Sequence, residues 1–180
     1  PWIDITREEY FVWSELTYRT IKEIDSRLKF GGPTTEGTTV LSDDSDSFEQ
    51  YFRYCKEHDC VPDFCAFHFY PHDFEHTEAD FDKLFAQQSA SPIELLDDPD
   101  AVSTMLDRIQ IKLAKLGLEH LELVLDKWNS TVWQHDLCND TAYKGAFIAK
   151  TALEYMHRVS MMGYGLYSDF VEELPPRETF

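Results

Sequence analysis

The residues best suited to chemistry lie in one short polar cluster that follows an apolar run. Leu121, Leu123 and Leu125 alternate with other residues, as expected of a buried strand, and the chain then continues Asp126-Lys127-Trp128-Asn129-Ser130. A strand that ends in polar side chains and a large aromatic is typical of a β/α barrel, whose chemistry takes place at the carboxyl ends of its strands. We therefore predict a ligand site at the end of a strand over 121–126.

A second pair of candidate residues lies earlier in the chain, in the segment Val61–Pro71. Aromatic residues stand at alternate positions in this segment, which predicts another strand. His68 and Tyr70 are two residues apart, so both point to the same side of that strand. A histidine in a strand is more often a satisfied core residue. Because Tyr70 lies in register at the strand end, the site and core interpretations of His68 are about equal.

The remaining elements follow from capping signals and periodicity. Thr6-Arg7-Glu8-Glu9 is a capping box that opens a helix ending at Asp25. The next strand ends in Gly31-Gly32-Pro33, which predicts a turn, and the polar residues 34–47 predict a loop. Asp98 and Asn139-Asp140-Thr141 are the expected caps of two later helices. The apolar positions of the four helices are Tyr10, Trp13, Thr17, Ile21 and Ile24; Phe48, Tyr51, Phe52 and Cys55; Leu106, Ile109, Leu113 and Leu116; and Tyr143, Phe147, Ile148, Ala152 and Tyr155.

The resulting order is one helix, then strand and helix three times, then a final strand. This alternation predicts an α/β fold with four parallel strands near 28–32, 62–68, 121–126 and 159–167, and with the helices packed outside. Four strands with two open edges also predict a homodimer or larger assembly.

Length and composition set bounds on fold and function. The 180 residues predict one domain, too short for a complete β/α barrel of about 250 residues. Acidic residues outnumber basic ones 34 to 16, and the net charge of −18 argues against direct contact with nucleic acid or anionic membranes. No apolar run is long enough to span a membrane. The chain starts at Pro1, which indicates a segment of a longer protein.

The cysteines and the acidic stretch 71–98 bear on metals and location. None of the four cysteines forms a C-x-x-C pair, so we expect no zinc, and free thiols predict a cytoplasmic protein. The stretch 71–98 contains His72, His76 and several carboxylates. Their spacing fits no defined metal motif, and a solvated acidic loop is the better interpretation. We therefore predict neither a metal nor a cofactor.

Four blocks of sequence, in order, resemble glycoside hydrolase family 39, the β-xylosidase and α-iduronidase family. The segment 123–131 resembles its seventh-strand pattern L-x-I-T-E-W-N-S-S, and 63–70 resembles its sixth-strand pattern D-F-V-S-x-H-x-Y. Residues 136–148 are similar to D-L-x-N-D-T-x-Y-K-A-A-Y-I, and 168–173 to S-D-V-F-E-E. The resemblance implies that residues 1–180 are a single half-barrel, about strands 5–8 of a (β/α)8 TIM barrel.

The same resemblance assigns roles to positions and shows where this chain departs from them. The family nucleophile is the Glu of T-E-W-N, and here Lys127 holds that position. The family acid/base Glu lies in an N-E-P motif that does not occur in this sequence, and Gly165 stands where the family has Trp. Asp126 is no easy substitute, because adjacent strand residues point to opposite sides. The implied substrate-binding residues are His68, Tyr70, Lys127, Trp128, Asn129, Glu172 and Glu173.

Two functions remain open. The preferred one is a non-hydrolytic module that binds xylose or xylo-oligosaccharides, as a sensor in an AraC-type transcription regulator, where such barrels also occur. The alternative is a fragment of an active retaining β-xylosidase whose upstream half is missing. An ordinary surface lysine is the plainer interpretation of Lys127, but Trp128 and Asn129 beside it keep the family identities.

Overall fold

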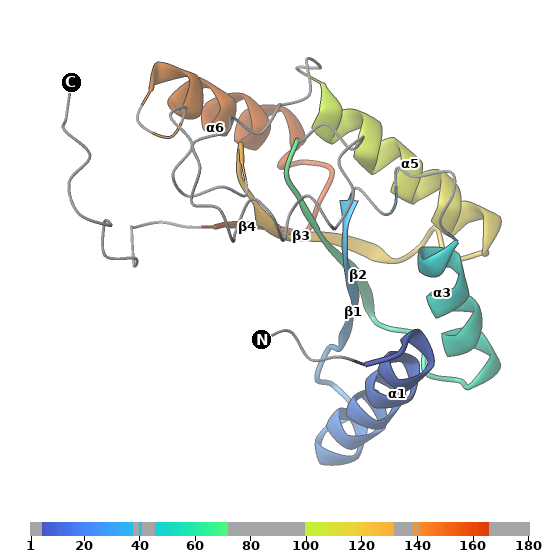
Figure 1. Cartoon of the computed structure of the whole chain (residues 1–180). Helices are drawn as coiled ribbons and strands as arrows, with labels where there is room; N and C mark the ends of the chain where they lie inside the picture. The colour runs from blue at the N-terminus through green and yellow to red at the C-terminus, as the bar shows by residue number, and fades with distance from the viewer. Residues whose placement is uncertain are drawn as a thin grey trace.

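A computed structural model describes residues 5–37, 40, 46–71, 100–131, 139 and 141–165. Four parallel strands form one sheet in the order β1-β2-β3-β4, and helices α3, α5 and α6 make an arc along one side of it (Figure 1). The predicted α/β fold with four parallel strands is thereby confirmed. The elements are α1 (Arg7–Ile24), β1 (Gly31–Glu36), α3 (Ser47–Glu57), β2 (Phe64–Phe69), α5 (Ala101–Lys115), β3 (Glu122–Trp128), α6 (Ala142–Tyr155) and β4 (Met161–Tyr164).

The hydrophobic core lies between the sheet and its helices. Phe67 and Phe69 of β2 and Leu125 of β3 are at most 1% exposed and belong to one buried cluster with residues of α3 and α5. Burial of side chains of this size stabilises the fold by about 1.5–3 kcal/mol each. All four apolar positions predicted for α3, and three of the four predicted for α5, are buried: Phe48, Tyr51, Phe52, Cys55, Leu106, Ile109 and Leu113.

Helix α1 begins as the sequence predicts but packs differently. The Thr6 hydroxyl accepts from the Glu9 backbone N–H, and the Glu9 carboxylate accepts from the Thr6 N–H, which completes the capping box. Phe11 is the buried residue of this helix, whereas Trp13 and Ile24 are 50% and 73% exposed. Thr17 is also exposed, so the predicted apolar stripe is wrong at these three positions, because periodicity gives a face but not what covers it.

The first strand differs from its prediction. It spans Gly31–Glu36, so Gly31-Gly32-Pro33 lies inside the strand instead of forming a turn after it. A Cβ on Gly31 would lie 1.9 Å from the Phe64 ring, and one on Gly32 would lie 2.5 Å from the Tyr51 hydroxyl. The glycines thus allow aromatic side chains to approach the strand closely. Pro33 is tolerated because β1 is an edge strand of the described sheet.

Several other boundaries also shift. The last strand is shorter than the predicted 159–167, and residues 166 and 167 lie outside the described part. Asp100, rather than Asp98, is the N-cap of α5. Thr141 is the N-cap of α6, but the predicted buried residue Tyr143 is 46% exposed. No helix in the described ranges combines the length and apolar content needed to cross a membrane.

Charged side chains at the amino-terminal end of the sheet are paired. Asp63, just before β2, accepts from the Phe30 N–H at 2.7 Å and forms a 2.8 Å salt bridge with Lys22 of α1. Glu122, at the start of β3, forms a 2.8 Å salt bridge with Lys29. These contacts connect α1, β1 and β2 at that end, and Lys29 also reaches across to β3.

Candidate functional site

A register shift in β3 positions Lys127. Phe67 pairs with Leu125 and His68 pairs with Lys127, so Asp126 is an extra residue on β3, as in a β-bulge. Strict alternation would place Lys127 on the same side as buried Leu125. The extra residue instead places it opposite His68, on the sheet face away from the helices. We call this face the inner face.

Three of the predicted site residues meet on the inner face. The rings of His68 and Tyr70 lie 6.4 Å apart, and the Lys127 Nζ lies 5.8 Å from the centre of the Tyr70 ring. Burial lowers the pKa of His68; Asp126 acts in the opposite direction, and the Lys127 charge lowers it further. The imidazole is therefore neutral at pH 7, and the cluster offers one positive charge flanked by neutral polar rings.

Asp126 joins this cluster. The Thr34 side chain of β1 acts on its carboxyl group in the direction that lowers its pKa, and the carboxyl group acts electrostatically on His68. The expectation that Asp126 faces away from Lys127 is thus wrong, because it assumed regular alternation where the strand has an extra residue. Burial raises the pKa of Asp126, and its Oδ1 is buried with no hydrogen-bond partner among the described residues. Thr34 has a φ of 54°, a rare conformation for a β-branched residue.

Trp128 and Asn129 have structural contacts of their own. The Trp128 indole is 4% exposed and packs against Phe147 of α6 and Tyr164 of β4. The Asn129 Nδ2 donates to the Gly165 carbonyl at 2.7 Å, and its Oδ1 accepts from the Ser130 N–H. Asn129 therefore connects the end of β3 to the end of β4.

Two glycines, Gly163 in β4 and Gly165 directly after it, allow β4 to lie close to β3. A Cβ on Gly163 would lie 2.2 Å from the Asp126 backbone oxygen, so the two strands come together at the bulge only with glycine there. A Cβ on Gly165 would lie 3.1 Å from Cγ and 3.3 Å from Cε of Lys127. Gly165 therefore leaves room for the lysine stem.

The structure thus brings together His68, Tyr70 and Lys127, with Asn129 beside them through Gly165, whereas Trp128 packs toward α6. Glu172 and Glu173, and the acidic stretch from His72 to Asp98, lie outside the described residues. Sequence reasoning missed Thr34 and rejected Asp126, and no local signal marks the register shift that brings them in. Among the described residues, no three His, Cys, Asp or Glu side chains are grouped so as to hold a metal ion.

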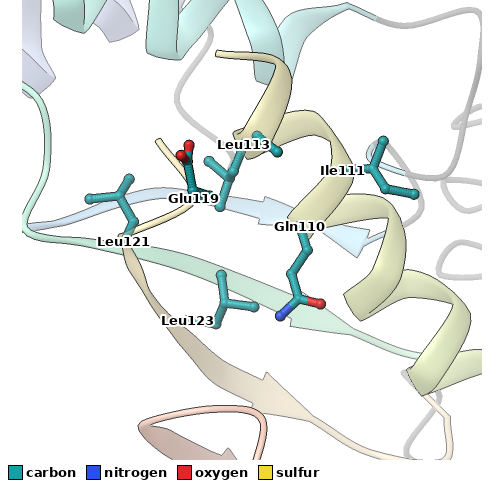
Figure 2. A pocket seen from close by; sticks show the side chains of 7 residues that line it. Gln110, Ile111, Leu113, Glu119, Leu121 and Leu123 are labelled. Carbon is teal, nitrogen blue, oxygen red and sulfur yellow. The ribbon is translucent and has the colours of Figure 1, made fainter. Parts of the chain in front are cut away.

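One hollow lies at the opposite end of the sheet. It is formed by α5, the residues leading into β3 and the start of β3, and Figure 2 shows the side chains that line it. Leu121 in its wall is six residues before Lys127, about 20 Å along a strand. In barrels that end contributes to stability rather than chemistry, so we do not assign the hollow to the site. The lining residues are Gln110, Ile111, Leu113, Ala114, Glu119, Leu121 and Leu123.

Parallel strands covered by helices on one side, with polar groups gathered at their carboxyl ends, define a segment of a β/α barrel. The sequence profile of the family described as "Glycosyl hydrolases family 39" matches residues 1–176. The chain belongs to this family.

Individual relatives agree with this assignment. The chain is 24% identical over 173 residues to a β-xylosidase from Geobacillus stearothermophilus, covering 96% of this chain and 32% of that protein. It is 25% identical over 170 residues to a β-xylosidase from Caldicellulosiruptor saccharolyticus, covering 93% of this chain and 30% of that protein. The chain thus spans about a third of the length of these curated relatives.

Solved structures show the same fold. The crystal structure of a monomeric β-xylosidase from Caulobacter crescentus CB15 superposes with a TM-score of 0.74 at 24% identity, covering 96% of this chain and 32% of that one. A family 39 enzyme from Xanthomonas axonopodis pv. citri superposes with a TM-score of 0.71 at 22% identity, over 91% of this chain and 29% of that one. The chain therefore has the fold of one part of a longer barrel.

Proposed function

We propose that residues 1–180 form a half-barrel that binds a small carbohydrate without hydrolysing it. The observation that carries this proposal is the position of Lys127, which faces His68 on the inner face where the family pattern has its nucleophile. A retaining glycosidase needs two carboxyl groups beside the scissile bond. An ammonium neither attacks an anomeric carbon as a carboxylate does nor stabilises a cationic transition state.

Binding without turnover is supported by the neutral groups around the lysine. The His68 imidazole and the Tyr70 ring lie side by side at the carboxyl end of β2, and groups of this kind bind and orient sugar hydroxyls. The two curated relatives are named β-xylosidases, which supports xylose or xylo-oligosaccharides as the ligand class. Glu172 and Glu173 belong to the proposed site on the family pattern alone.

In the cell, this module would sense a sugar for an AraC-type transcription regulator. The net charge of −18 supports a module that does not itself touch DNA, so DNA binding would belong to another part of the regulator. The thiols of Cys55, Cys60 and Cys65 are free and buried, in keeping with a reducing cytoplasm.

The second candidate, a fragment of an active retaining β-xylosidase, is favoured by one observation. Asp126 places a carboxyl group beside His68 on the inner face, and burial raises its pKa as general acids require. In that case Asp126, not Lys127, would supply one of the two carboxyl groups.

Two measurements on the longest natural protein that contains this segment separate the candidates. We expect no nitrophenol release from aryl xylosides, and measurable heat on calorimetric titration with xylose or xylo-oligosaccharides. In the 180-residue chain on its own, Lys127→Glu should not create activity, because the family's acid/base motif does not occur in this sequence and two carboxyl groups act together. Turnover that Asp126→Asn abolishes would establish the hydrolase instead, and the absence of both turnover and binding heat would leave a purely structural segment.

We also propose that the chain assembles with copies of itself. β1 and β4 are the edge strands of the described sheet, and open parallel edges favour pairing. Val12, Trp13 and Leu16 of α1 are 46–58% exposed, and Met161 of β4 is 54% exposed. Light scattering at increasing concentration should show a dimer or larger species, and a well-folded monomer at high concentration would contradict this.

A further inference from the structure

Lys127 differs from the paired lysines of this chain. Lys22, Lys29, Lys112 and Lys150 each lie within 3.0 Å of a carboxylate oxygen. Within the described ranges, Lys127 forms neither a salt bridge nor a hydrogen bond, and its ammonium contacts the face of the Tyr70 ring. A cation that pairs with no carboxylate of the described residues is available to an anionic ligand.

Asp126, the residue before Lys127, does not pair with it. The Thr34 side chain and the backbone N–H groups of Asp126 and Lys127 act on the Asp126 carboxyl group in the direction that lowers its pKa, against the larger effect of burial. This carboxyl group does not lie within salt-bridge distance of the Lys127 ammonium. His68, the residue opposite, is held neutral by burial and by the lysine charge, so it neither neutralises Lys127 nor adds a second cation.

Gly165 makes the lysine conformation sterically possible. A Cβ at 165 would lie 3.1–3.3 Å from two stem carbons of Lys127, closer than ordinary van der Waals contact. The Asn129 amide holds the Gly165 carbonyl at 2.7 Å, which limits how far this residue can move away. The two departures from the family pattern, Lys127 and Gly165, are therefore neighbours in space and fit each other.

We infer that Lys127 binds the carboxylate of a sugar acid, and that this carboxylate is carried by C1, as in an aldonate. In a retaining site the nucleophile position faces the anomeric carbon. An ammonium there meets the same atom of the ligand, and an aldonate carries its negative charge on C1 whereas neutral xylose has none. The inference rests on the proposed carbohydrate site and adds the class of ligand.

Calorimetric titration of the full chain with three probes tests the inference. D-xylonate carries its charge at C1, D-glucuronate carries it at C6, and D-xylose is neutral. We expect xylonate to bind about 10- to 100-fold more tightly than xylose, the range of a hydrogen bond to a charged group. The preference should decrease with added salt, because charge attraction is screened.

Variants assign the preference to Lys127. Lys127→Met keeps an unbranched stem and removes the charge, so it should abolish the preference for xylonate over xylose. Lys127→Arg should retain most of the preference. Thermal unfolding of each variant shows whether it is folded.

The possible outcomes separate this inference from the proposed function. Equal binding of xylose and xylonate, unchanged by Lys127→Met, overturns the inference and leaves the sugar site intact. Tighter binding of glucuronate than xylonate overturns the assignment to C1. No heat with any of the three probes overturns both proposals.

A double-mutant cycle tests the fit of Gly165 to Lys127 without any ligand. Gly165→Ala should lower the midpoint of thermal unfolding in the presence of Lys127 and have little effect in a Lys127→Ala background. Equal effects in the two backgrounds would show that the lysine stem does not need the space at residue 165.

Discussion

The two ends of the sheet differ in whether their charged side chains have partners among the described residues. At the amino-terminal end, Asp63 binds Lys22 and the Phe30 N–H, and Glu122 binds Lys29. At the carboxyl end, Lys127 lacks a carboxylate partner in the described part of the chain, and one oxygen of Asp126 is buried without a hydrogen bond there. Pairing at one end stabilises the fold, whereas at the other end the buried Asp126 oxygen is costly and the exposed Lys127 ammonium is suited to a ligand.

The largest effect is expected where β4 meets the bulge at the carboxyl end. Gly163→Ala would place a Cβ 2.2 Å from the Asp126 backbone oxygen, so the strands must separate. We expect a loss of about 3 kcal/mol in the free energy of unfolding, measured by urea denaturation.

Gly145→Ala in α6 is the matched control for that substitution. No atom lies within 4 Å of a Cβ built there, and alanine is the better helix former. It should raise the free energy of unfolding by roughly 0.5–1 kcal/mol. Equal destabilisation by both alanines would show that the close approach at Gly163 is unimportant.

A smaller loss is expected at the paired end. Asp63→Ala leaves the Lys22 ammonium and the Phe30 N–H without their acceptor and should cost about 1–3 kcal/mol. Glu122→Ala breaks an exposed ion pair and should cost less than Asp63→Ala, because solvent and salt screen exposed charges. Neither change should alter sugar affinity, because both residues lie at the far end of the sheet. A Glu122 effect as large as that of Asp63 would contradict this ranking.

The smallest effect, and the sharpest contrast, is the pH dependence of the two aspartates. Burial raises the pKa of Asp63, but its bonds to Lys22 and Phe30 outweigh burial and hold the pKa below its ordinary value. Its contribution to stability is therefore present above about pH 4 and is lost as the pH falls further. Burial raises the pKa of Asp126, so the folded state keeps a proton that the unfolded state has released. Stability then decreases as the pH rises above about 4.

Urea denaturation across pH 2 to 7 distinguishes these opposite signs. Asp63→Asn should remove stability mainly at the upper pH values. Asp126→Asn should slightly increase stability there, because the desolvated charge is gone. A loss of stability at neutral pH with Asp126→Asn would mean that the ionised carboxylate is well bound, and the contrast between the two ends would fail.

The sequence by itself determined the elements whose signals are local. The capping box at Thr6 and Glu9 starts α1, the apolar spacing of Phe48, Tyr51 and Phe52 gives the buried face of α3, and the order of strands and helices gives a parallel sheet. Each of these depends on hydrogen bonds or burial within a few residues of the chain, which periodicity reports directly.

The tertiary structure alone decided how the site is built. Whether Gly31 and Gly32 form a turn or a strand depends on the Phe64 and Tyr51 side chains that cover them. The position of Lys127 opposite His68 depends on one extra residue in β3, which moves every later side chain to the other face of the sheet. Register and close packing arise between segments distant in sequence, so no local pattern specifies them.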